Sequence, residues 1–181
     1  MKDLDKFHSQ LDLPFLETQN EFIKEIFQTL ELEFSLERNS NQKIIDLGAG
    51  NGSVVIYATL NYYIKSFGIE IDQNLKSEAE NRIISLKKSG NYKKKVFKKI
   101  KIKLGDFYLL NLREYDFIYV YSLPSMQKYL MHVFSTAKIG AILISHKYHL
   151  EGFSSILKDE YTLIHKNGKQ KICTYFYKKI I

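Results

Sequence analysis

The sequence predicts an α/β domain with a mostly parallel sheet, helices on both faces and an antiparallel hairpin at the carboxyl end. The main observation is a β-branched run, a glycine-rich turn and an apolar helical run that follow one another between Lys43 and Ala58. This order is typical of the first strand, loop and helix of a nucleotide-binding unit. Strand-like runs then alternate with helical patterns as far as Ser145. Finally, Asn167-Gly168 separates two strand-like runs, which is a strong hairpin signal.

Length and composition favour one compact domain. The chain has 181 residues, of which 45% are hydrophobic, enough for a sizeable core. We therefore predict a single domain over residues 1–181, with an amino-terminal helical segment (1–40) and an α/β core (41–181). The charged start and the lack of any apolar run near the roughly 18 residues of a membrane helix indicate a cytoplasmic protein without membrane insertion. A single cysteine, Cys173, and five scattered histidines predict neither a disulfide nor a metal site.

A predicted amphipathic helix precedes the sheet. From Leu16 onward apolar residues recur at helical spacing, and Thr18 with Glu21 gives a capping-box pattern. Packing explains the apolar face of this helix, whereas Thr18 and Phe15 are candidates to border a ligand. Residues 1–40 hold nine acidic and four basic side chains, so this segment is acidic.

The glycine-rich turn reads Asp46-Leu47-Gly48-Ala49-Gly50-Asn51-Gly52, a D-x-G-x-G-x-G pattern. Side chains on these glycines would fill the space that a ligand needs, and glycine tolerates the positive φ of such a turn. Amide groups at the start of the next helix then face an anionic group. A dinucleotide fingerprint would need glycine in place of Ser53, and no phosphate loop ending in Gly-Lys-Ser/Thr is present. These two ligand classes are therefore disfavoured.

The second strand is predicted to end in an acidic residue. Residues 64–69 read as a strand that ends in Glu70-Ile71-Asp72, about 20 residues beyond the glycine loop. A carboxylate at this position can accept hydrogen bonds from ribose hydroxyls. Glu70 is the candidate for that role, with Ile71 beside it, whereas Asp72 is better placed to cap the following helix.

The net charge of +7 comes from one stretch. Nine lysines and no acidic residue lie between Lys87 and Lys103, so the remaining residues sum to about −2. Strict alternation over residues 99–104 predicts a half-exposed strand, and lysines on an edge strand block pairing with other chains. A nucleic-acid surface is the alternative interpretation. The solvated edge is favoured because only three of the 27 basic residues are arginine, the residue preferred for bidentate phosphate contacts.

Two further stretches follow the third and fourth strands. In Gly105-Asp106-Phe107, the acid can accept from an adenine amino group and the aromatic ring can stack nearby. Tyr115 to Tyr121 is predicted to be a buried central strand, followed by a helix that opens at Ser122 and carries apolar residues as far as Phe134.

Together these motifs resemble those of the class I S-adenosylmethionine (AdoMet) methyltransferases. The resemblance implies a Rossmann-like, seven-stranded, mostly parallel sheet with a carboxyl-terminal antiparallel hairpin, and AdoMet as cofactor. No metal is implied, because the sulfonium donor is already activated and the protein supplies alignment and excludes water. The residues implied to bind AdoMet are Thr18, Asp46, Gly48, Ala49, Gly50, Asn51, Gly52, Glu70, Ile71, Asp106 and Phe107.

More narrowly, the chain is similar to the small protein lysine methyltransferases of archaea and mitochondria. This resemblance implies methyl transfer to a lysine ε-amine of a protein, and an acidic segment at 1–40 would attract a basic substrate. Tyr121 and Ser122 are the candidate catalytic residues by their location. The shared elements are Pro14-Phe15 with Thr18, the glycine loop, Gly68-Ile69-Glu70, Gly105-Asp106-Phe107, Tyr119-Val120-Tyr121 and Ser145-His146-Lys147-Tyr148.

The loop after the fourth strand bears on the acceptor. Adenine-N6 and glutamine methyltransferases carry Asn/Asp-x-Pro-aromatic there, whereas this chain has Ser122-Leu123-Pro124-Ser125. The amide and the stacking ring are both missing, which weakens the adenine interpretation. Cytosine-C5 enzymes need a cysteine near this loop, and Cys173 lies on the predicted hairpin instead. Methylation of an RNA base is the alternative function, and an inactive AdoMet-binding module is a less favoured one.

Overall fold

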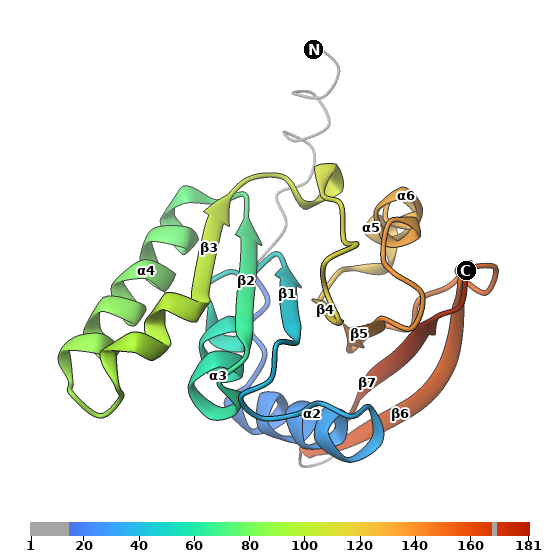
Figure 1. Ribbon diagram of the computed structural model, residues 1–181. Coiled ribbons are helices and arrows are strands. Elements are labelled where there is room, and N and C mark those ends of the chain that lie inside the picture. Colours follow the sequence, from blue (N-terminus) through green and yellow to red (C-terminus); the bar gives the residue numbers. More distant parts are fainter. Residues whose placement is uncertain (1–14, 168–169) are drawn as a thin grey trace, which may run out of the picture.

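A computed structural model describes residues 15–167 and 170–181. Its sheet has seven strands in the order β3-β2-β1-β4-β5-β7-β6 (Figure 1). Strands β1 to β5 are parallel, whereas β7 is antiparallel to β5 and β6. The α/β Rossmann-like fold predicted from the sequence is therefore confirmed. The strands are β1 (Lys43–Leu47), β2 (Lys65–Glu70), β3 (Ile100–Leu104), β4 (Phe117–Val120), β5 (Ile142–His146), β6 (Leu157–Asn167) and β7 (Gln170–Lys179).

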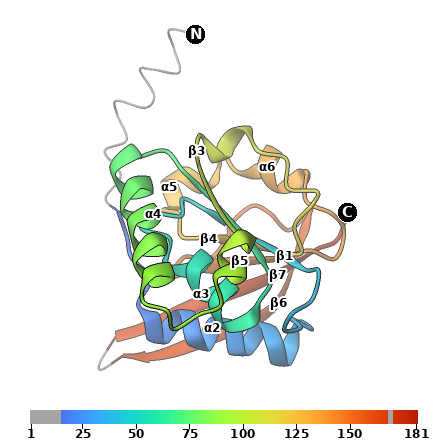
Figure 2. The same cartoon turned by 60° about the vertical axis from the view of Figure 1, so that its left-hand side comes forward.

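Helices cover both faces of this sheet (Figures 1 and 2). Successive residues of the central strands join different hydrophobic clusters, because side chains of a strand alternate between its faces. Ile44 packs in the cluster with α2 and α3, whereas Ile45 packs in the cluster with α6. The helices are α2 (Asn20–Glu33), α3 (Ser53–Tyr62), α4 (Gln73–Lys88), α5 (Pro124–Gln127) and α6 (Met131–Ser135), with 3-10 helices η1 (Lys94–Lys99) and η2 (Phe107–Leu109).

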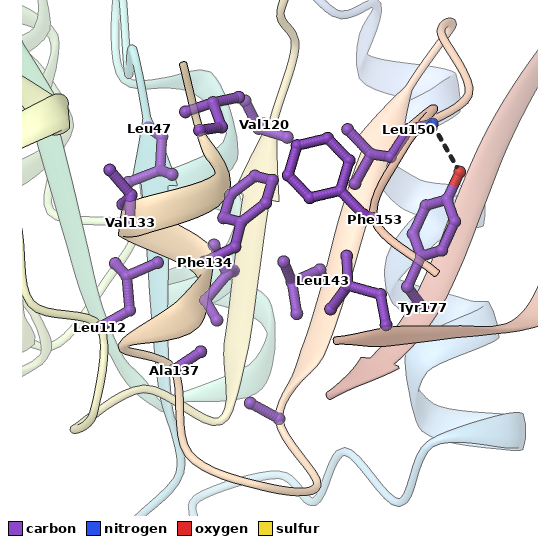
Figure 3. Packing of buried hydrophobic residues seen from close by; sticks show 14 of the residues in the cluster. Leu47, Leu112, Val120, Val133, Phe134, Ala137, Leu143, Leu150, Phe153 and Tyr177 are labelled. Carbon is purple, nitrogen blue, oxygen red and sulfur yellow. Dashed lines mark hydrogen bonds between the residues drawn. The ribbon is translucent and has the colours of Figure 1, made fainter. Parts of the chain in front are cut away.

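The cluster on the α6 face fixes the strands that carry the candidate site. The rings of Phe134 and Phe153 lie 5.4 Å apart and pack with Leu143 of β5 (Figure 3). The backbone amide of Leu150 donates a hydrogen bond of 2.8 Å to the Tyr177 hydroxyl, shown as the dashed line in Figure 3. The loop after β5 is thereby tied to β7. Among the described residues, no helix is both long and apolar enough to cross a membrane.

The predicted capping box at Thr18 is wrong. Helix α2 begins at Asn20 rather than near Leu16, and its cap residue, Gln19, makes no side-chain capping bond. The Thr18 hydroxyl instead lies 2.7 Å from the hydroxyl of Tyr119. A buried tyrosine hydroxyl needs a hydrogen-bond partner, and this tertiary contact takes the side chain that the sequence pattern assigned to the helix.

The single helix predicted from Ser122 to Phe134 is also wrong, because the chain forms two short helices, α5 and α6, there. The amides of Tyr129 and Leu130 bond to carbonyls three residues earlier, which tightens the chain into a turn between them. The apolar spacing is satisfied by both arrangements, so it did not reveal the break. Two predicted features, the Pro14 element and the Gly168 turn of the hairpin, lie outside the described residues.

Candidate active site at the carboxyl ends of the parallel strands

The loop between β1 and α3 contains three glycines with positive φ. Gly48, Gly50 and Gly52 have φ values of 86°, 51° and 80°, in the left-handed region that favours glycine. A Cβ atom on Gly50 would lie 2.0 Å from a ring carbon of Phe15, and one on Gly48 would lie 3.9 Å from the ring of Phe107. Two aromatic rings from distant segments therefore lie close to this loop.

The carboxylate of Glu70 joins the glycine loop to the end of β2. Its Oε2 accepts a hydrogen bond from the Gly50 amide at 2.6 Å, and its Oε1 accepts from the amides of Ile71 and Asp72 at 2.8 and 2.9 Å. An ionised carboxylate has about four acceptor sites, so Oε2 keeps one for a further donor. As predicted, Asp72 rather than Glu70 caps α4.

Asp46 and Tyr119 form a buried pair beside the loop. They are neighbours in the register of β1 and β4, and both are less than 5% exposed. Burial, and then the nearby charge of Glu70, raises the pKa of Asp46 well above its usual range. Burial likewise raises the pKa of Tyr119, so its hydroxyl stays protonated at neutral pH. A cationic group of a ligand would stabilise the Asp46 carboxylate in this position.

A second polar cluster anchors the segment before α2, and sequence reasoning missed it. Asn51 Nδ2 donates to Glu17 Oε1 at 2.7 Å, and the Ser53 hydroxyl lies 3.2 Å from the same oxygen. Arg82 Nη1 donates to the Asn51 carbonyl at 3.0 Å and to the Ser53 hydroxyl at 2.8 Å. These bonds hold residues 15–18 over the glycine loop. In the sequence, the one feature that could have drawn attention to this cluster is that Arg82 is one of only three arginines.

One pocket collects side chains from the segment before α2, the glycine loop and β4. Its position at the carboxyl ends of parallel strands is where open α/β sheets bind ligands. Five predicted cofactor residues, Thr18, Asp46, Gly48, Ala49 and Asn51, share the pocket with the catalytic candidate Tyr121. The lining residues are Phe15, Leu16, Glu17, Thr18, Asp46, Gly48, Ala49, Asn51, Ser53, Val54, Tyr119 and Tyr121.

Seven candidates are not among the lining residues: Gly50, Gly52, Glu70, Ile71, Asp106, Phe107 and Ser122. Ile71 is 57% exposed next to Glu70 at the end of β2, and Asp106 accepts the Tyr108 amide at 2.8 Å at the end of β3. Ser122 is not among the lining residues, and its buried hydroxyl has no hydrogen-bond partner in the described part of the chain. The same part of the chain contains no group of three or more His, Cys, Asp or Glu residues that could hold a metal ion.

A family comparison covers most of this site. The ANTKMT methyltransferase domain family matches residues 46–156, a span that begins at Asp46 and includes the glycine loop, Glu70 and Tyr121. No curated protein matches the sequence significantly.

Solved structures with the same fold act on different acceptors according to their descriptions. An RNA methyltransferase from Salinibacter ruber, crystallised with S-adenosyl-L-homocysteine, is 22% identical, with a TM-score of 0.71 over 91% of this chain and 94% of that chain. A SAM-dependent O-methyltransferase from Thermotoga maritima is 12% identical, with a TM-score of 0.65 over 93% of this chain and 68% of that chain. At these identities the similarity shows the fold alone.

Proposed function

The chain belongs to the ANTKMT methyltransferase domain family, within the class I AdoMet-dependent methyltransferases, and from this premise we propose that it methylates the ε-amine of a protein lysine. The family match over residues 46–156 is the observation that carries the proposal. The geometry of the pocket supports it, because the pocket combines the buried carboxyl group of Asp46, two tyrosine rings and the acidic side chain of Glu17.

The carboxyl ends of β1, β2 and β3 offer suitable partners for each part of AdoMet. Glu70 Oε2 keeps an acceptor site for a ribose hydroxyl. Asp106 suits the adenine amino group, while Ile71 and Phe107 offer apolar surface to the ring. Asp46 suits the cationic amino group of the methionine part, because that charge offsets the cost of burying its carboxylate. AdoMet supplies a methyl group that its sulfonium already activates for displacement.

The protein must then align a neutral amine and exclude water. A lysine side chain has an ordinary pKa of about 10.4, so it arrives as an ammonium ion and has to lose a proton. Burial next to another positive charge favours that loss. Phe15 lies over Gly50, and Tyr119 and Tyr121 line the pocket, so aromatic rings shield the reaction from water.

Charge near the pocket favours a basic substrate. Glu17 is one of the lining residues, and Glu21 and Glu25 follow on α2. An acidic border of this kind raises the local concentration of a basic protein segment. The missing amide and aromatic ring in the loop Ser122 to Ser125 further disfavour a planar adenine acceptor.

RNA is the second candidate acceptor, favoured by the similarity to the Salinibacter ruber RNA methyltransferase. The exposed lysines 93–95 would be the obvious RNA-binding surface. They precede β3, however, whose amino end pairs with Ser66 while its carboxyl end pairs with Glu70 (Figure 1). The lysines therefore lie at the end of the sheet opposite the candidate site, which makes protein lysine the better-supported acceptor.

Methyl-labelled AdoMet tests the proposal directly. The protein is incubated with a cell extract, and parallel samples are treated with protease or with ribonuclease. We expect label in protease-sensitive material and, by mass spectrometry, methyl groups on lysine side chains. Label confined to ribonuclease-sensitive material would show that the acceptor is RNA instead.

A further inference from the structure

Four hydrogen-bonded side chains connect the end of β5 to the surface of α2. His146 Nδ1 lies 2.8 Å from the Thr174 hydroxyl, and that hydroxyl lies 2.7 Å from His165 Nε2. His165 Nδ1 in turn lies 2.5 Å from Glu25 Oε2. The first three residues are 3% exposed or less, whereas the Glu25 side chain is 43% exposed. This series of hydrogen bonds therefore runs from the protein interior to solvent.

The inner end of this chain adjoins the candidate active site. The His146 ring stands perpendicular to the ring of Tyr121, a pocket-lining residue, with their centroids 5.0 Å apart. Phe22 of α2 covers the other side, with ring centroids 5.9 Å from His146 and 4.4 Å from His165. The two histidines are thus enclosed by aromatic rings between the pocket and α2.

The donor and the acceptor of each of these three hydrogen bonds follow from the chemistry of the side chains. The Glu25 carboxylate only accepts, so Nδ1 of His165 donates to it, and Nε2 of a neutral His165 is an acceptor. The Thr174 hydroxyl must then donate to His165, and its oxygen accepts from Nδ1 of His146. As a result, Nε2 of His146 carries a lone pair and no proton. One carboxylate at the surface therefore sets the tautomer of a histidine next to the pocket.

We propose, building on the proposed lysine acceptor, that these four side chains act as a proton relay. The relay takes up the proton that the substrate ammonium must release. Nε2 of His146 accepts the proton while its Nδ1 proton moves to the Thr174 oxygen, and the hydroxyl proton of Thr174 moves to Nε2 of His165. The positive charge then rests on the His165 imidazolium, paired with Glu25. The lysine nitrogen keeps its electron pair, which forms the new N–C bond as the C–S electron pair leaves on sulfur. After product release, the reverse transfers return the proton to water.

Proton transfer onward to His165 is needed because a positive charge on the buried His146 ring is unfavourable. Burial, followed by the charges of His165 and Lys147, lowers the pKa of His146 to about 3. At His165 the transferred charge would have a counter-ion, because Nδ1 of His165 lies 2.5 Å from the Glu25 carboxylate. The titratable groups that face the two rings are Glu25 from α2, Tyr119 from β4, Tyr121 directly after β4, and Lys147 after β5.

Two variants of Thr174 test the relay. Thr174→Val keeps the shape of the side chain but removes the hydroxyl, whereas Thr174→Ser keeps the hydroxyl. We expect kcat of Thr174→Val on a lysine substrate to fall about 100-fold near pH 7, within the usual contribution of a positioned proton acceptor. The loss should shrink as the pH rises, because more substrate amine is then already neutral. AdoMet affinity serves as the control and should stay near wild type. Thr174→Val should lower the unfolding temperature, because it leaves two buried histidine nitrogens unpaired, so kcat is compared well below that temperature. Thr174→Ser should keep kcat within a few-fold.

Nitrogen-15 NMR of the histidines gives a readout that does not depend on activity. At about pH 9, both His146 and His165 are expected to carry their proton on Nδ1, and an Nε2-protonated His146 would overturn the relay. Equal kcat and equal pH profiles for wild type and Thr174→Val would also overturn it, as would an equal loss in Thr174→Ser. A wild-type protein that methylates no lysine would instead overturn the proposed acceptor and, with it, the role of the relay.

Discussion

Replacement of Glu70 by alanine is expected to weaken AdoMet binding about 10- to 100-fold, or roughly 1.4 to 2.8 kcal/mol. The carboxylate would be lost as a ribose acceptor, and the amides of Gly50, Ile71 and Asp72 would lose their common partner. Because the Gly50 amide is buried and would be left unpaired, the free energy of unfolding of the variant should also fall by about 1 to 3 kcal/mol. Calorimetry with AdoMet and denaturant unfolding measure the two effects.

Asp72→Ala is the matched control for this change. It removes the neighbouring carboxylate, which caps α4 through two amides, and should cost about 1 kcal/mol of stability. Its AdoMet affinity should match that of wild type. If Glu70→Ala remained folded and bound AdoMet as tightly as wild type, the assignment of Glu70 to the ribose would be wrong.

Asp46→Asn should separate stability from binding. The folded-state pKa of Asp46 lies well above its usual value of about 4, so the folded protein binds more protons than the unfolded chain above that pH. The stability that Asp46 contributes is therefore fully present below about pH 4 and is lost as the pH rises through the folded-state pKa. Asparagine carries no charge to bury, so the ligand-free variant should be more stable than wild type at pH 7, by about 1 to 3 kcal/mol.

The same variant should bind AdoMet about 10- to 100-fold more weakly, because the cationic part of the ligand loses its counter-charge. Unfolding measured between pH 4 and pH 8 should show the stability difference vanish at the acidic end. Asp159→Asn, at a side chain that is 70% exposed, is the control and should change neither quantity. A stability difference that stayed constant with pH would contradict the assigned state of Asp46.

Local patterns predicted the fold and the outline of the pocket. The glycine spacing, the carboxylate at the end of β2 and the cap of α4 each depend on a few consecutive residues, and the structure has all three features. The edge strand and the hairpin were also predictable, because both signals are short-range. Period-two alternation indicated the edge strand, and an Asn-Gly pair indicated the hairpin. Whether each predicted site residue contacts AdoMet stays a prediction.

Contacts between distant segments were not predictable in the same way. Glu17 and Arg82 meet Asn51 across 34 and 31 residues, and no pattern near either one marks the contact. His165 and Glu25 are 140 residues apart and meet only because β6 lies next to α2. Thr18 shows the opposite failure, since a valid local capping pattern was overridden by a bond to Tyr119.

These distant contacts give the pocket its cover. The bonds of Glu17 and Thr18 hold residues 15–18 across the glycine loop, where Phe15 lies over Gly50. A ligand that enters between them must move the Phe15 ring or slide beneath it. The segment before α2 therefore belongs to the site, although the family match begins only at Asp46.

A crystal structure of the protein with S-adenosyl-L-homocysteine is the most direct test of where the cofactor binds. We expect a ribose hydroxyl within hydrogen-bond distance of Glu70 Oε2, the adenine between Ile71 and Phe107, and the amino group of the amino-acid part beside Asp46. Electron density for the ligand at any position away from the carboxyl ends of β1, β2 and β3 would contradict this placement.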